Sequence, residues 1–266
     1  MTTEEAPRLT TRQITGDAVA LLRQSFDVAW PWWFFLFVLE SGNAARAVLM
    51  SPPPPAAGHL PPPLTPLAIG LTLGLGAVAT LLGAFALRAM ISGKAERPRL
   101  DGGLWGYVGL SFAGQAAWTL ITVVTSPLAE RAIALAPGAR PPPELLPEMI
   151  GALVGFGVLA FLFARLALWP AARLMGETAI GPAASWRRMR GAVWPLVAST
   201  LLLVLPVAMA GVAVLITVQG PTLPLASSPV LGVMAALESA LELAVMAAIW
   251  RARVKPAPVV LSKPAA

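Results

Sequence analysis

The sequence predicts an all-α, polytopic membrane protein with six transmembrane helices. Composition is the first reason, because 57% of the 266 residues are hydrophobic and only 12% are charged, whereas soluble domains are about 25% charged. The mean hydropathy of +0.73 agrees with this. The other two reasons are long apolar windows with few charges and the uneven placement of Lys and Arg around them.

The segment before the first apolar window predicts a tail over residues 1–9 and an amphipathic surface helix over residues 10–27. In a helix one face would carry mostly apolar side chains: Ile14, Ala18, Leu21, Leu22 and Ser25. Charged side chains accompany them: Arg12, Arg23 and Asp27. A helix of this kind lies in the plane of the membrane interface. We therefore expect residues 1–28 to form a cytoplasmic segment of tail and surface helix.

Four apolar windows predict the first four spans, over residues 29–50, 64–91, 104–126 and 148–172. Each is long enough for ~30 Å of hydrocarbon at ~1.5 Å per residue. The first begins near Pro31, which suits a first helical turn, and it is the least apolar because it contains Glu40, Asn43 and Arg46. Glu40 and Asn43 could line a wet cavity, or Glu40 could lie near the outer interface.

The charge-free window from Gly191 to Leu237 predicts two further spans, because a straight helix over its 47 residues would be ~70 Å long. Pro and Gly residues at 220–229 supply the turn. We expect a fifth span at 191–218, kinked at Pro206, and a sixth at 229–250. Residues 29–250 then form the transmembrane domain, and residues 251–266 form a cytoplasmic tail.

Basic residues predict the orientation of these spans. Sixteen of the 19 Lys and Arg residues border the ends assigned to one side of the membrane, and only Arg46, Arg131 and Arg140 remain for the other. Because basic loops stay in the cytoplasm, both termini should be cytoplasmic. Eight of the nine Trp residues fall near the same ends, as an aromatic belt would. Basic residues that follow span ends indicate lipid headgroups and argue against a nucleic-acid partner.

The stretch ARLALWPAARLMGETAIGPAASWRRMRGAVWPL joins the fourth and fifth predicted spans. It resembles bacterial membrane proteins that carry the glycerophosphoryl diester phosphodiesterase membrane-domain pattern. The matching positions are Arg165, Pro170, Glu177, Trp186, Gly191 and Trp194. The specific part covers about thirty residues, and the surface helix and six-span layout extend the likeness to residues 10–255.

This resemblance implies a six-helix membrane domain in a bacterial inner (plasma) membrane. Some family members are fused to a soluble phosphodiesterase. Such an enzyme needs His and several acidic metal ligands, and this chain contains one His. The resemblance therefore implies fold and location, and it does not imply hydrolysis.

Charged residues inside the predicted spans form the first candidate site. Glu238 and Glu242 share one face of the sixth span, and Arg165 lies at a similar depth in the fourth. Each carboxylate would cost about 2.5–3.5 kcal/mol at the centre of a spanning helix. Either these side chains form a proton or cation relay, or they form a structural ion pair, for which depth favours Arg165 with Glu242. Snorkelling of Arg165 to the headgroups is the alternative.

The second candidate site is a basic segment just before the fifth span, where we expect an interfacial helix. Its side chains are Trp186, Arg187, Arg188 and Arg190. Anionic lipid headgroups are the expected partner, and a docking site for a cytoplasmic protein is the alternative.

Covalent chemistry is not indicated, because the chain has no Cys and one His, His59, and no catalytic, metal or cofactor motif. We expect a non-enzymatic protein with a membrane-organising, lipid-associated or accessory role. The alternative is a small proton-coupled carrier. Small residues recur along the sixth span from Gly232 to Ala248, which predicts close helix packing within the chain or against a membrane-protein partner or second copy.

Overall fold

The computed structural model describes residues 9–50, 66–94, 97–133, 145–217 and 224–254, and their regular secondary structure is entirely helical. The helices in chain order are α1 (Thr11–Met50), α2 (Pro66–Ser92), α3 (Gly102–Ile133), α4 (Leu145–Leu166), α5 (Leu168–Leu174), α6 (Pro182–Arg188), α7 (Val193–Thr217) and α8 (Pro224–Arg253). The predicted all-α class is therefore confirmed.

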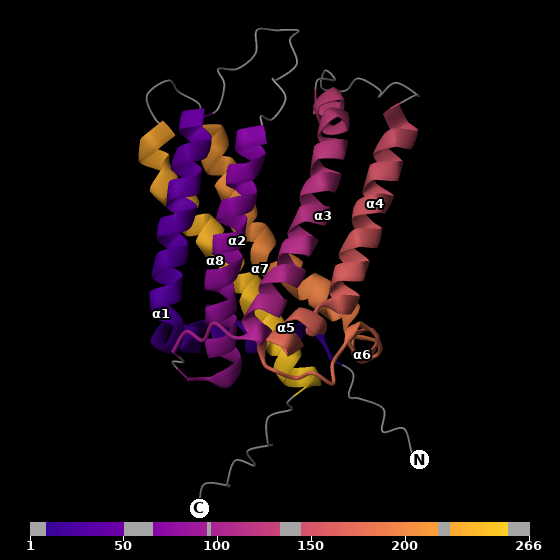
Figure 1. Ribbon diagram of the computed structural model, residues 1–266. Helices are drawn as coiled ribbons and strands as arrows, with labels where there is room; N and C mark the ends of the chain where they lie inside the picture. Colours follow the sequence, from indigo (N-terminus) through magenta and orange to yellow (C-terminus); the bar gives the residue numbers. More distant parts are fainter. Residues whose placement is uncertain (1–8, 51–65, 95–96, 134–144, 218–223, 255–266) are drawn as a thin grey trace, which may run out of the picture.

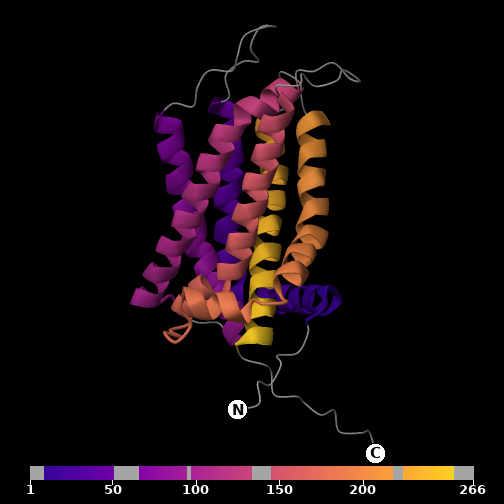
Figure 2. The same ribbon diagram turned by 90° about the vertical axis from the view of Figure 1, so that its right-hand side faces the viewer.

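The long helices α1, α2, α3, α4, α7 and α8 run lengthwise through the bundle (Figure 1). The short helices α5 and α6 lie at one end, together with the start of α1 and the end of α8 (Figures 1 and 2). We call this end the base. Both ends of the described chain therefore lie at the base.

Four helical segments within the described residues are long and apolar enough to cross a membrane. They are Gly70–Ser92, Leu146–Leu174, Val193–Val214 and Ser228–Arg253. They correspond to the predicted second, fourth, fifth and sixth spans, so the chain is a helical membrane protein. The fourth combines α4 with α5. The predicted first and third spans fall in α1 and α3, which are not among these segments.

Helix α1 joins two elements that the sequence treats separately, since one helix of 40 residues contains the expected surface helix, Pro31 and the expected first span. Its N-terminal part lies across the base, and the rest rises beside α8 (Figure 2). Ile14, Ala18 and Leu21 on the predicted apolar face are buried in the protein. At the same place Ser199 Oγ of α7 donates to Thr11 O over 3.2 Å. The bundle, rather than the membrane, therefore covers this face.

The pairing of α1 with α8 is the most extensive in the bundle. Gly232 permits their close approach, because a Cβ atom there would lie 2.5 Å from Ser41 Cα. Further along α8, Ala240, Ala244 and Ala248 are buried. The small residues predicted in the sixth span thus serve packing within the chain.

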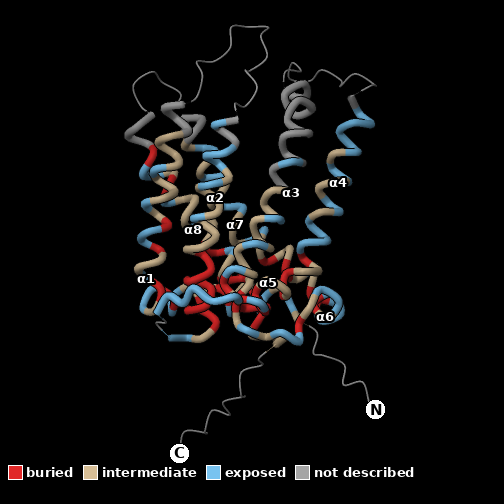
Figure 3. The backbone as a smooth tube through the Cα atoms, in the orientation of Figure 1, coloured by how far each residue is buried: buried red, intermediate tan, exposed pale blue. Residues whose placement is uncertain are grey.

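Buried apolar side chains concentrate at the base (Figure 3). Leu87 of α2, Leu104 of α3, Leu168 of α5, Met189 after α6 and Trp250 of α8 are fully buried. The predicted aromatic belt is therefore correct only in part. Some Trp residues at this end are exposed, namely Trp30, Trp105, Trp186 and Trp194, but Trp33 and Trp250 belong to the core.

A buried arginine connects three helices at the base. Arg88 of α2 forms an ion pair with Asp101 at 3.0 Å, and its Nη2 donates to Leu174 O at the end of α5 over 2.7 Å. Asp101 Oδ1 also accepts from Leu104 N over 2.8 Å, which caps α3. The hydrogen bond from Arg88, followed by that from Leu104, lowers the pKa of the Asp101 carboxyl. The charge buried at the base, that of Arg88, therefore has an acidic partner in Asp101.

Candidate functional site

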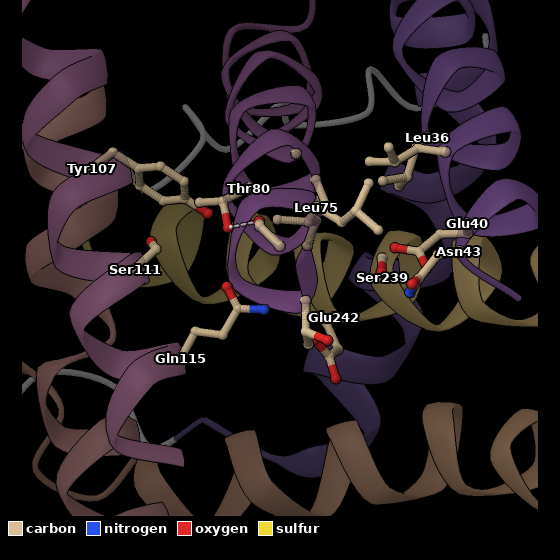
Figure 4. Close-up of a pocket in the computed structure, with 16 residues that line it drawn as sticks. Leu36, Glu40, Asn43, Leu75, Thr80, Tyr107, Ser111, Gln115, Ser239 and Glu242 are labelled. Atoms are coloured by element: carbon tan, nitrogen blue, oxygen red, sulfur yellow. Dashed lines mark hydrogen bonds between the residues drawn. The ribbon is translucent and has the colours of Figure 1, made fainter. Parts of the chain in front are cut away.

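A polar cavity of about 410 Å³ lies between α1, α2, α3 and α8. Its polar lining consists of Glu40, Asn43, Thr72, Thr80, Tyr107, Ser111, Gln115, Ser239 and Glu242. The apolar remainder of the wall includes Leu36, Leu75 and Leu243. Several helices meet here with polar side chains directed into one space (Figure 4).

Helical spacing explains why these side chains meet, because residues three or four apart share a face. On α3, Tyr107, Ser111 and Gln115 follow one another at intervals of four. Helices α1 and α8 each add a pair at an interval of three, Glu40 with Asn43 and Ser239 with Glu242. On α2 the polar pair is Thr72 and Thr80. Each helix thus turns one polar stripe toward the cavity.

Glu242 is the central acidic residue, because it lines this cavity and a second one next to it. Its surface is exposed to these spaces. Within the described part of the chain its carboxylate has no ion pair or hydrogen bond. The nearby cation is otherwise engaged, since Arg46 Nη2 of α1 donates to Asn43 Oδ1 over 3.0 Å and to Thr72 Oγ1 over 3.4 Å. Glu242 therefore faces the cavity without a basic partner.

Gln115 adds an unsatisfied acceptor to the same space. Its side chain extends from α3 toward α2 and α8 (Figure 4). Its Oε1 is buried and has no hydrogen-bond partner among the described residues. Gly76 leaves room for this amide, because a Cβ atom there would lie 2.5 Å from Gln115 Nε2. A buried acceptor without a donor is costly, so a bound group that donates hydrogen bonds would be favoured here.

The second cavity is a mainly apolar cleft of about 770 Å³ between α3, α4, α5 and α8. Its apolar walls include Leu110, Phe163, Leu166, Trp169 and Met246. It shares a wall with the polar cavity, formed by Tyr107, Ser111, Gln115 and Glu242. The acidic and amide groups therefore stand at the junction of a polar space and an apolar space.

Arg165 does not belong to this site, which corrects the predicted pairing with Glu242. Its guanidinium carbon lies 5.2 Å from the ring centroids of both Phe161 and Trp186, and Nη1 donates to Trp186 O over 3.2 Å. Ser185 Oγ donates to Arg165 O over 3.0 Å. Axial depth, on which the prediction rested, does not fix which face of a helix carries a side chain. Cation–π contacts at the base engage this arginine instead.

The predicted cluster is thus reduced to its glutamates. Glu238 is half-buried and lies outside the lining of both cavities. It is still close enough to interact electrostatically with Glu40 and Glu242. Glu40 and Asn43 do line a cavity, as one of the two interpretations of the first span expected. The acidic residues that line the polar cavity are therefore Glu40 and Glu242, and Glu238 lies nearby.

The predicted basic segment forms α6 and the turn after it. Trp186 is 39% exposed, and Arg187, Arg188 and Arg190 are exposed, whereas Met189 between them is buried. Buried Met189 anchors the segment to the base, and Arg188 Nη1 also donates to Arg253 O at the end of α8 over 3.5 Å. Gly191, with φ +77°, follows at the start of the connection to α7.

Sequence reasoning missed Thr72, Thr80, Tyr107, Ser111 and Gln115. Their signal was present as polar residues that repeat every four or eight positions within apolar helices. Singly, Ser and Thr are unremarkable in spans because they bond to their own backbone, as Thr80 Oγ1 does to Gly76 O over 2.8 Å. The periodicity, rather than the residue type, was the indicator.

Comparisons with protein-family models, with curated proteins and with solved structures found no match to this chain.

Proposed function

We propose that this protein is a small bacterial inner-membrane carrier that binds a cation in the polar cavity in exchange for protons. The single observation behind this proposal is Glu242, whose carboxylate opens into a polar cavity with no basic partner among the described residues. The alternative is a purely structural role, in which the charged residues of the spans would all be paired with one another and would not border a cavity.

Electrostatics gives the physical reason. A carboxylate in the interior of a membrane protein is costly unless it is neutralised. Glu40 and Glu242 line one cavity, and Glu238 adds a third nearby acidic side chain. A proton or a cation relieves the same charge, so the two compete for the same carboxylate. This competition is the basis of exchange transport.

The proposal includes six spans, with α1 and α3 added to the four apolar segments, and cytoplasmic termini. It is supported by the basic side chains around the base, where both described ends lie. Because the chain has no Cys, single Cys substitutions report cleanly. An impermeant thiol reagent added to intact cells should label Gly58→Cys, which lies outside the described residues, and should not label Arg97→Cys. The opposite pattern would reverse the orientation.

Proteoliposomes with a trapped pH-sensitive dye test the exchange. External sodium, potassium, tetramethylammonium and benzyltrimethylammonium are added in turn against an imposed proton gradient. We expect at least one of these cations to drive proton movement, which Glu242→Gln abolishes. Asp27→Asn, which removes an exposed carboxylate at the base, should retain it. Proton movement that is unaffected by all four cations would overturn the proposal.

A second candidate function is association with anionic lipid at the base, in a non-enzymatic, membrane-organising or accessory role. It is supported by exposed Arg187, Arg188 and Arg190 beside Trp186, each worth about 1 kcal/mol near an anionic surface. Replacing the three arginines with Gln should reduce the anionic lipid that co-purifies in mild detergent. Unchanged lipid content would remove this candidate.

The likeness to the glycerophosphoryl diester phosphodiesterase membrane-domain pattern remains a proposal about kinship. It is supported by the contact between two of its residues, Arg165 and Trp186. Neither candidate function includes a covalent reaction.

A further inference from the structure

We infer that the cation taken by this carrier is amphipathic, with its charged group at Glu242 and an apolar body in the cleft between α3 and α4. The inference rests on the proposed function and names its substrate class. It begins from the wall that the two cavities share, in which Glu242 and Gln115 face both the polar and the apolar space.

The shared wall selects for positive charge. Glu242 supplies a carboxylate without a basic partner in the described chain, and Gln115 Oε1 supplies a buried acceptor without a donor. Glu40 adds a second carboxylate across the polar cavity. A cation in this space neutralises the Glu242 carboxylate by charge attraction and does not need an N–H donor to do so. An anion of the same size would meet the same groups with repulsion.

The cleft selects for an apolar body. Phe163, Leu166 and Met246 form much of its wall, and its volume of about 770 Å³ falls in the range of about 300–1,000 Å³ typical of small-molecule sites. Inorganic cations would use the polar cavity alone and leave this cleft unused.

Equilibrium binding to the full-length protein in zwitterionic-lipid nanodiscs tests both requirements. Tetraphenylphosphonium and tetraphenylborate have nearly the same shape and opposite charge, and tetramethylammonium has the charge without the apolar body. After subtraction of binding to empty nanodiscs, we expect tetraphenylphosphonium to bind at least about tenfold more tightly than either of the other two.

Two variants separate the two halves of the site. Glu242→Gln should weaken tetraphenylphosphonium binding at least about tenfold. Ala113→Trp, which places a large ring in the cleft, should weaken tetraphenylphosphonium and spare tetramethylammonium. Asp27→Asn is the matched control and should bind both probes like the unmodified protein. Thermal unfolding checks that each variant is folded.

The outcomes distinguish this inference from the function on which it rests. If tetramethylammonium binds as tightly as tetraphenylphosphonium and both depend on Glu242, the carrier stands and the amphipathic substrate is wrong. Equal binding of tetraphenylphosphonium and tetraphenylborate would mean that the cleft only collects apolar molecules, as a lipid-filled groove would. If no cation binds in a Glu242-dependent manner, both proposals fail.

Discussion

The base and the cavity region of this bundle share helices α1, α2, α3 and α8. The base is closely packed with apolar side chains, whereas the cavity region is open and lined by polar side chains. On α2, every residue from Ala84 to Ile91 is buried, whereas the residues that line the polar cavity end at Gly83. On α8 the cavity lining ends at Leu243, and the largely buried run begins at Ala244. On both helices the longest run of largely buried residues therefore follows directly after the lining of the polar cavity.

Charge is treated differently in the two regions. In the base, Arg88 is buried with Asp101 and a backbone carbonyl as partners. In the cavity, Glu242 has no such partner among the described residues. A region that pairs its charges gains a fixed structure, and a region that leaves a carboxylate open keeps a place for a ligand at some cost in stability. The base therefore provides the scaffold, and the cavity region provides the binding site.

Among changes to charged residues, the largest effect should come from breaking the paired charge. Arg88→Met leaves Leu174 O without its buried donor and removes the ion pair with Asp101, whose side chain is 45% exposed. We expect a loss of about 2–4 kcal/mol in the free energy of unfolding. Arg97→Met is the matched control, because its side chain is exposed. Denaturant unfolding in detergent measures both. Similar losses for the two variants would mean that the base does not depend on the ion pair.

Removing apolar volume should separate the two regions along a single helix. Leu87→Ala, at a fully buried position in α2, should cost about 2–5 kcal/mol. Leu71→Ala, near the other end of the same helix and 38% exposed, should cost less than about 1 kcal/mol. Thermal unfolding of the two variants side by side gives the difference. Equal costs would contradict the contrast in packing.

Asp101 supplies a smaller, pH-dependent part of the stability of the base. Asp101→Ala should cost about 1–2 kcal/mol, because it removes the cap of α3 and the partly exposed ion pair with Arg88, which keeps its bond to Leu174 O. Because the hydrogen bond from Arg88 lowers the pKa of Asp101, its stabilisation is present at neutral pH and disappears as the pH falls through that lowered value. The difference in the free energy of unfolding between the Asp101→Ala variant and the unmodified protein should therefore become smaller only at acidic pH. If this difference stays constant as the pH falls through the lowered pKa of Asp101, the ion pair of Asp101 with Arg88 does not stabilise the base.

In the cavity region, removal of a charge should have the smallest effect on the free energy of unfolding. Glu242→Gln removes a charge that has no basic partner in the described chain, so the free energy of unfolding should stay within about 1 kcal/mol of the original or rise. Denaturant unfolding of the Glu242→Gln and Arg88→Met variants under the same conditions compares their free energies of unfolding. A loss as large as that for Arg88→Met would show that Glu242 has a structural partner.

Much of the fold could be predicted because hydropathy and breakers report on single helices. The windows for α2, α4, α7 and α8 needed only length and a low number of charged residues. Pro31 misled the prediction of α1, since proline suits a helix start but here lies inside a continuous helix. Hydropathy places residues along a helix and says little about which neighbours they meet.

The candidate site was harder to predict because it depends on which faces of different helices meet. Glu242 was identified from its cost in a membrane, but its expected partner Arg165 points toward Trp186 at the base. Tyr107 and Gln115 acquire meaning only once α3 is known to face α2 and α8. No periodicity within one helix contains that information, although polar stripes at helical spacing identify the faces to be matched.

Modification by dicyclohexylcarbodiimide, an apolar reagent that reacts with protonated carboxyl groups, tests the central claim most directly. Mass spectrometry of the labelled protein should find Glu242 modified and Asp101 unmodified, and tetraphenylphosphonium should slow the reaction at Glu242. An unreactive Glu242, or a rate that no cation changes, would contradict the account of an open carboxylate that binds cations.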